Sequence, residues 1–123
     1  MKREIKFRGK DPKGGWVEGY YLQDLTQGEM RSYIFNCPCY WEVIPETVGQ
    51  FTGLLDKNGK EIWEHDIVDW DGVMLVVEFV DGGFCMHENY EGATLHDLFF
   101  ERNEINVIGN VFDNPELLEG GAE

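Results

Sequence analysis

The sequence predicts a mainly β fold, and its composition and its pattern both support this. Aromatic residues make up 14% of the 123 residues, and there are 15 glycines but only 4 prolines. Such a composition is typical of short strands joined by tight turns rather than of a helix bundle. Several segments also alternate apolar and polar residues with the period of two that marks a half-buried strand. We therefore expect a mainly β or α+β domain of short antiparallel strands.

The length predicts one domain over residues 1–118. A chain of 123 residues can bury a single hydrophobic core, and 42% of its residues are apolar, which is enough to offset the entropy lost on folding. Residues 119–123 form an acidic, glycine-containing tail that we expect to be frayed.

The first predicted strands form a hairpin. Residues 4–8 alternate Ile5 and Phe7 with charged side chains, a turn cluster follows at residues 11–15, and residues 16–22 resume the alternation.

A polar segment follows, and residues 23–29 are expected to be a loop. Strands are predicted at residues 30–36 and 41–44. They are separated by the Cys-Pro-Cys sequence at residues 37–39, and because proline has no backbone N–H this place is an edge, a bulge or a turn.

Glycine pairs divide the second half into short strands. An Asn-Gly pair ends a predicted tight turn over residues 56–59, and the Asp-Gly pair at residues 71–72 is the one that a type I′ hairpin turn favours. A similar turn is expected at residues 81–83. The strands predicted around these turns are residues 60–63, 67–70, 73–80 and 84–87, with a last strand at residues 105–112.

Two short helical turns are compatible with the pattern. Residues 94–100 fit a helix, because Leu95, Leu98 and Phe99 lie at i, i+3 and i+4, or alternatively a strand. A helical turn is expected at residues 115–118, which begin with a proline suited to the first helical position.

The charge is uneven along the chain. The net charge is −14, yet residues 1–13 hold six bases and two acids, a net of +4, whereas residues 61–123 hold 16 acids and one base, Arg102, a net of −15. The overall charge opposes any partner that is recognised through phosphates, so we expect no nucleic acid partner. The basic segment could pair with acids of its own chain or of another subunit, or both charge groups could simply be solvated.

No stretch of 18 apolar residues is present, and no apolar segment follows the basic start as in a signal peptide. We therefore expect a cytoplasmic protein with no membrane partner. Three cysteines, an odd number, are typical of reduced thiols in such a compartment.

Two pairs of candidate metal ligands occur at i, i+2, a spacing that places both members of a pair on one face of a strand. They are Cys37 with Cys39, and Cys85 with His87. Together they could present four ligands to zinc. Zinc sites more often use a two-residue spacer, and cysteines among β residues are usually small core side chains. We therefore expect no metal and no cofactor.

Five titratable residues lie close together in the sequence: Glu64, His65, Asp66, Asp69 and Asp71. In a strand the first and third would share one face and the histidine would point to the other. The segment does not match a calcium-binding loop, so we interpret these side chains as solvated strand and turn acids.

Catalytic motifs are missing from the sequence. Ser32 is the only serine and has no G-x-S-x-G sequence around it, and a Cys85–His87 pair would need an orienting group and a cleft. The Gly-Gly pairs stand in predicted hairpin turns rather than before helices. We expect no catalytic residues and no enzymatic activity.

Four segments together resemble the YopX family, small proteins of Gram-positive bacteria and their phages. They are REIKFRGKD, WVEGYYL, VGQFTGLLDKNGKEIWEHDIV and VIGNVFDNPELL, whereas residues 71–102 match poorly. The family pattern has glycine where this chain has His65. The position therefore either does not need a positive φ or tolerates histidine at one.

The resemblance implies a barrel-like β core, a phage or prophage origin and assembly into a homo-oligomer, and it brings no catalytic residues. We favour a non-catalytic oligomeric structural or interaction module. The alternatives are an acidic, DNA-mimic-like decoy that binds a basic host protein and a metal-binding protein or enzyme. We expect at least two of Trp41, Trp63 and Trp70 to lie in the core, with any other at an interface.

Overall fold

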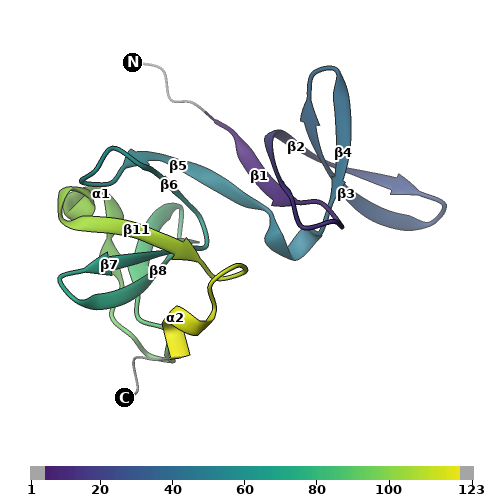
Figure 1. Ribbon diagram of the computed structural model, residues 1–123. Helices are drawn as coiled ribbons and strands as arrows, with labels where there is room; N and C mark the ends of the chain where they lie inside the picture. The colour runs from purple at the N-terminus through teal and green to yellow at the C-terminus, as the bar shows by residue number, and fades with distance from the viewer. Residues whose placement is uncertain (1–4, 120–123) are drawn as a thin grey trace. The chain divides into compact units, whose positions relative to one another are not determined.

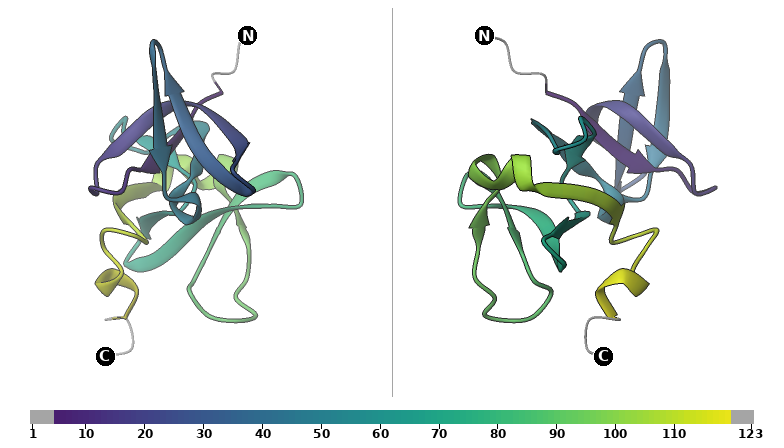
Figure 2. Two further views of the ribbon diagram at one scale, coloured as in Figure 1. Left: turned by 90° about the vertical axis from the view of Figure 1, so that its right-hand side faces the viewer. Right: turned by 60° about the vertical axis from the view of Figure 1, so that its left-hand side comes forward.

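The computed structural model describes residues 5–119, and β-strands dominate it, as predicted (Figure 1). The chain divides into two compact units, the first ending at Phe51 and the second beginning at Thr52. In both views of Figure 2 the first unit carries the purple to blue colours and the second the teal to yellow. The single domain expected over residues 1–118 stays a prediction. It requires that the two units fold and unfold together.

The strands of the first unit belong to a six-stranded sheet with order β4-β3-β2-β1-β5-β6, of which β6 and the end of β5 are in the second unit. The elements of the first unit are β1 (Phe7–Lys10), β2 (Trp16–Thr26), β3 (Glu29–Asn36), β4 (Cys39–Val43), the 3₁₀ helix η1 (Pro45–Thr47) and the beginning of β5 (Gly49–Leu55). The predicted hairpin of the first two strands is confirmed, because β1 pairs with β2 from Phe7 opposite Gly19 to Lys10 opposite Trp16.

The loop predicted at residues 23–29 is wrong. Strand β2 runs through this segment, and β3 begins after a two-residue turn at Gln27 and Gly28, which have φ values of 52° and 84°. Asp24 lies opposite Arg31 in the hairpin. Polar side chains on both strands of an exposed hairpin tip remain in solvent, so the polarity of this segment is compatible with a ladder.

The Cys-Pro-Cys sequence forms the turn between β3 and β4, one of the three alternatives predicted, and its Cys37–Pro38 peptide bond is cis. The core of the first unit lies on one face of the sheet, where Ser32 and Ile34 of β3 and Val43 of β4 are 2%, 0% and 3% exposed. Because side chains alternate along a strand, the residues between them point to the opposite face.

The second unit contains the end of β5 and a five-stranded antiparallel sheet with order β10-β9-β8-β7-β11. Its elements are β6 (Glu61–Trp63), β7 (Asp66–Trp70), β8 (Val73–Val80), β9 (Gly83–His87), β10 (His96–Asp97), α1 (Leu98–Glu101), the 3₁₀ helix η2 (Arg102–Glu104), β11 (Ile105–Asn110) and α2 (Glu116–Glu119). Within residues 5–119 no sheet closes on itself, so the barrel-like core is not a closed barrel.

The glycine-pair turns are confirmed. Asp71 and Gly72 have φ values of 51° and 89°, and Asp81 and Gly82 have 51° and 85°, as type I′ turns require. They join β7, β8 and β9 into the predicted meander. Residues 94–100 combine both alternatives, a two-residue strand followed by a short helix. The tail expected to fray lies, except for Glu119 in α2, outside the described residues.

A single apolar cluster holds the second unit together. Its buried members are Ile62, Val68, Leu75, Val77, Met86, Leu98 and Ile105. Trp63 is 3% exposed, and the partly buried Trp70 packs against the cluster. Trp41 of the first unit is 44% exposed. The expectation that at least two of these three tryptophans are core residues therefore holds fully for Trp63 and only in part for Trp70.

Candidate functional site

The exposed face of the first unit carries a row of aromatic side chains across three strands. Tyr20 of β2 lies opposite Phe35 of β3, which lies opposite Tyr40 of β4. The Phe35 and Tyr40 ring centroids are 4.7 Å apart, and Tyr20 and Tyr40 are 68% and 63% exposed. The aromatic row, as we call these three residues, lies on the face opposite the buried Ile34. Exposed aromatic side chains gathered on one face are a feature by which contact surfaces are recognised.

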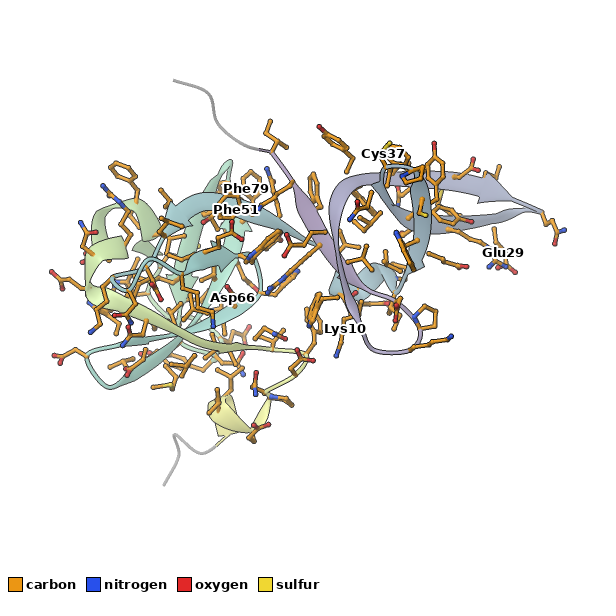
Figure 3. The ribbon with its side chains drawn as sticks, turned by 45° about the horizontal axis from the view of Figure 1, so that its top comes forward. Lys10, Glu29, Cys37, Phe51, Asp66 and Phe79 are labelled. Atoms are coloured by element: carbon orange, nitrogen blue, oxygen red, sulfur yellow. The ribbon has the colours of Figure 1, made fainter. Side chains whose placement is uncertain are left out.

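Paired charges share this face. Arg31 lies 3.1 Å from a carboxylate oxygen of Glu42 and 3.5 Å from one of Glu29, the hairpin residue labelled in Figure 3. Lys6 lies 3.9 Å from Glu18 on the β1 side. The aromatic row is therefore flanked by both signs of charge.

Three bases of the basic segment, one just before β1 and two within it, also contact aromatic rings. The Arg8 guanidinium lies 4.6 Å from the ring centroid of Trp16, Lys10 Nζ lies 5.5 Å from the same ring, and Lys6 Nζ lies 4.9 Å from that of Phe51. The basic segment thus engages its own unit through cation–π contacts. Its residues 1–4 lie outside the described residues.

The two pairs considered as candidate metal ligands, for which we expect no metal, belong to different units. Cys37 and Cys39 are exposed at the turn between β3 and β4 of the first unit, and Figure 3 labels Cys37 there. Cys85 and His87 lie on β9 of the second unit. Within residues 5–119, no three histidine, cysteine or acidic side chains are grouped so that they could hold a metal ion.

The Cys85 thiol is unsuited to nucleophilic chemistry. Its side chain is buried, and burial, together with the negative charges of Glu78, Asp81 and Asp97, raises the pKa of the thiol. The thiolate is the reactive form, and a raised pKa lowers its population at neutral pH.

His87 is held by two acceptor oxygens. Its Nε2 lies 2.9 Å from Glu78 Oε1 and its Nδ1 lies 2.7 Å from the carbonyl oxygen of Glu88. Burial lowers the pKa of His87, but the hydrogen bonds to Glu88 and Glu78 and the Glu78 charge outweigh it, so the pKa is raised. Because both ring nitrogens face acceptors, the doubly protonated imidazolium fits this site best. The ring braces β9 against β8 rather than activating Cys85.

Glu64 and His65 form the turn between β6 and β7, and Asp66 is the first residue of β7, so the alternation of a continuous strand considered for residues 64–66 does not apply. His65 has φ 77°, its N–H donates to the Val77 carbonyl at 2.8 Å and its carbonyl accepts from Val111 at 3.0 Å. The ring meets Phe112 edge-on with centroids 5.3 Å apart. These contacts fix His65 between β8 and the end of β11.

Asp66, which we interpreted as a solvated acid, is buried. Its side chain, labelled in Figure 3, is 2% exposed and accepts a 2.8 Å hydrogen bond from the Trp63 N–H. Asp69 is a turn acid as predicted, and its carboxylate accepts from the Gly72 N–H at 2.8 Å. Both carboxylates accept hydrogen bonds from backbone N–H groups and so stabilise the local turns. This geometry does not direct either of them toward a ligand.

Asp56 is a buried carboxylate that the sequence interpretation missed. One oxygen accepts from the N–H groups of Asn58 and Lys60 at 2.8 and 2.9 Å, and the other accepts from the Val107 N–H at 2.9 Å. Burial raises its pKa, but these hydrogen bonds and the Lys60 charge outweigh burial and lower the pKa. Aspartate at the start of an Asx turn was the available signal. No sequence signal predicts the hydrogen bond from Val107, which connects this turn to β11.

The second unit also has an open hollow of about 580 Å³, lined by Lys57, Trp70, Asp71, Val73, Asn103 and Glu104. The Trp70 indole N–H donates to Glu104 at 3.4 Å, a long hydrogen bond. Side chains of opposite charge and one tryptophan line the hollow. Their polar groups do not point to one position, so the hollow does not indicate a particular reaction.

Comparison with known protein families identifies the family of this chain. The model of the YopX protein family matches residues 6–119, nearly the whole chain. The chain belongs to the YopX family. The YopX pattern has glycine at the position of His65. The position does require a positive φ, and histidine tolerates it, because His65 has a φ of 77°.

A solved structure is similar over the whole length of this YopX protein. The crystal structure of protein EF1440 from Enterococcus faecalis has 25% sequence identity and a TM-score of 0.57. The match covers 95% of this chain and 99% of that one. No curated protein matches the chain. Among the described residues, none of the helices has the length and apolar character to cross a membrane.

Proposed function

We propose that this YopX protein is a non-catalytic module that self-associates through its first unit. The observation that carries the proposal is the division of charge between the units. Residues 1–51 contain seven lysines and arginines against seven acids, whereas residues 52–123 contain three against seventeen. The first unit is therefore neutral, and the whole net charge of −14 belongs to the second.

This division favours one mode of self-association. Two copies that meet through their second units bring like charges together, and this repulsion extends over a Debye length of about 8 Å at physiological salt. Two copies that meet through their first units avoid most of this repulsion. Both units expose large apolar side chains, so the charge decides between them; those of the neutral first unit include Tyr20, Leu25, Met30, Tyr40 and Trp41.

The chemistry of the best-placed residues supports a non-catalytic role. Cys85 has a raised pKa, and His87 is engaged by acceptors at both ring nitrogens. A nucleophile and base pair requires the opposite, a thiol of lowered pKa beside an imidazole that can accept its proton.

Sedimentation velocity over a range of protein concentrations, at low and at high salt, tests the proposal. We expect a defined oligomer that persists at high salt, because apolar contacts are not screened. An oligomer that dissociates at high salt would instead implicate the basic strand β1. A monomer at all concentrations would overturn the proposal.

The same charge division favours a second candidate function, an acidic decoy that binds a basic host protein. With seventeen acids, the second unit could imitate the charge of DNA in the phage setting that the family resemblance implies. Capture of a basic protein at low salt and its release at high salt would support this function. The absence of any basic partner in low-salt pull-downs would oppose it.

A further inference from the structure

We infer that the aromatic row of Tyr20, Phe35 and Tyr40 is the surface on which a second copy of this chain docks, face to face. The inference rests on the proposed self-association and names its contact surface. Three strands present the row in register, so the three side chains lie side by side on one exposed face.

The row is apolar beyond its three rings. In the next register position, Leu22 of β2 lies opposite Tyr33 of β3, and both are half-buried on the same face. Tyrosine supplies a large contact area with few rotatable bonds, which is why it is enriched at the centres of interfaces. The exposed rings of Tyr20 and Tyr40 are therefore suited to bury area at low entropic cost.

The charges beside the row favour a second copy over a partner of one charge sign. Arg31 lies between Glu29 and Glu42, and Lys6 pairs with Glu18. A two-fold axis through the row would place the same patch on both sides of the contact. A patch that carries both signs can then align its bases with the acids of the other copy. A strongly basic partner would meet repulsion from the two bases, and a strongly acidic partner would meet repulsion from the three acids.

The size of the face sets the expected strength. Strands β1 to β4 lie about 4.8 Å apart and rise about 3.4 Å per residue, so a face about eight residues long covers about 500 Å². Stable complexes bury about 800 Å² per partner. We therefore expect a reversible dimer with a dissociation constant in the micromolar range.

Lysine substitutions at the two exposed rings test the inference. In the double variant Tyr20→Lys/Tyr40→Lys, both changes are at positions more than 60% exposed. We expect at least a tenfold rise in the dimer dissociation constant by sedimentation, with an unchanged circular dichroism spectrum. The matched control is Tyr90→Lys/Leu95→Lys, which adds the same charge at residues of the second unit that are 60% and 53% exposed. Its dissociation constant should be that of the wild type.

The outcomes separate the two proposals. An oligomeric wild type whose assembly survives Tyr20→Lys/Tyr40→Lys would overturn the aromatic row as the contact and leave self-association intact. A monomeric wild type would overturn both. If the lysines disturb the sheet, the milder pair Tyr20→Ser/Tyr40→Ser replaces them, and an unchanged dissociation constant there would equally overturn the inference.

Discussion

Both tryptophans of the second unit lie in or against its core, whereas Trp41 of the first unit is exposed, as are Tyr20 and Tyr40. The second unit buries seven apolar residues in one cluster and carries all of the net charge. The first is neutral and exposes aromatic rings. Both units expose large apolar side chains, and those of the second include Phe79, Tyr90 and Phe99. The units therefore differ chiefly in charge, and only the first combines exposed aromatic rings with a net charge of zero.

The largest expected effect is in the core of the second unit. Met86 is fully buried in the apolar cluster, so Met86→Ala should lower the free energy of unfolding by about 2–5 kcal/mol, through lost apolar burial and the cavity left behind. Chemical denaturation measures the loss, and hydrogen exchange of peptides from each unit shows where it falls. One domain over residues 1–118 requires that both units lose protection together.

If only peptides of the second unit lost protection from hydrogen exchange, the single domain would be contradicted. The two units would then also differ in stability. The control is Leu95→Ala, at an exposed position of the second unit, which should change stability by less than about 0.5 kcal/mol.

A smaller effect is expected in the first unit at Gly19. A Cβ at this position of β2 would overlap the carbonyl oxygen of Phe35, a backbone atom that cannot rotate away. Gly19→Ala should therefore destabilise the protein by about 1–3 kcal/mol and weaken self-association, since Phe35 belongs to the aromatic row. Gly83→Ala is the control, because no atom lies within 4 Å of its Cβ position. Equal stability of the two variants would argue against this close approach of β2 and β3.

The next effect depends on acid. The pKa of Asp56 is lowered in the folded state from an ordinary value of 3.8. Its contribution is therefore present above about pH 4 and is lost as the pH falls through the folded pKa. Asp56→Asn should cost about 1–2 kcal/mol at pH 7 and flatten the pH dependence of unfolding below pH 4. Denaturation at several pH values checks both results.

Asp81→Asn, at an exposed turn of the same unit, is the control for Asp56 and should leave the pH dependence unchanged. If both variants behaved alike, the general acidity of the second unit rather than Asp56 would explain acid unfolding.

The smallest effect is expected at His87, whose pKa is raised from an ordinary value of 6.5. Its contribution is fully present below pH 6.5 and is lost as the pH rises through the folded pKa. His87→Gln should cost less than about 1 kcal/mol at pH 6, because Glu78 is partly exposed to solvent. NMR titration of the wild type measures the pKa directly. A value at or below 6.5 would contradict the imidazolium assignment.

The hairpin turns were predictable because their chemistry is local. Asp71 with Gly72 and Asp81 with Gly82 need positive φ, which these residue types favour, and both turns form as expected. Gln27 is not a typical residue for that conformation, so the sequence predicts a loop where the third turn of this kind forms. The local signal failed there because pairing of the long β2 and β3 strands overrides the preference of one residue.

The candidate surface was harder to predict than the turns. Tyr20, Phe35 and Tyr40 come from three strands, and only their register brings them into one row. The register of β2 with β3 depends on the turn at residue 27 that was missed. Asp66 shows the same limit, since its burial follows from a hydrogen bond to Trp63 that closes the turn at residues 64–65.

The three thiols also differ between the units, and this gives the protein a natural labelling scheme. Cys37 and Cys39 are exposed, whereas Cys85 is buried with a raised pKa. A brief maleimide treatment should therefore attach probes to the first unit alone. Cys39 directly precedes Tyr40 of the aromatic row. Spin labels on Cys37 and Cys39 together would therefore report the distances between two associated copies without any engineered residue.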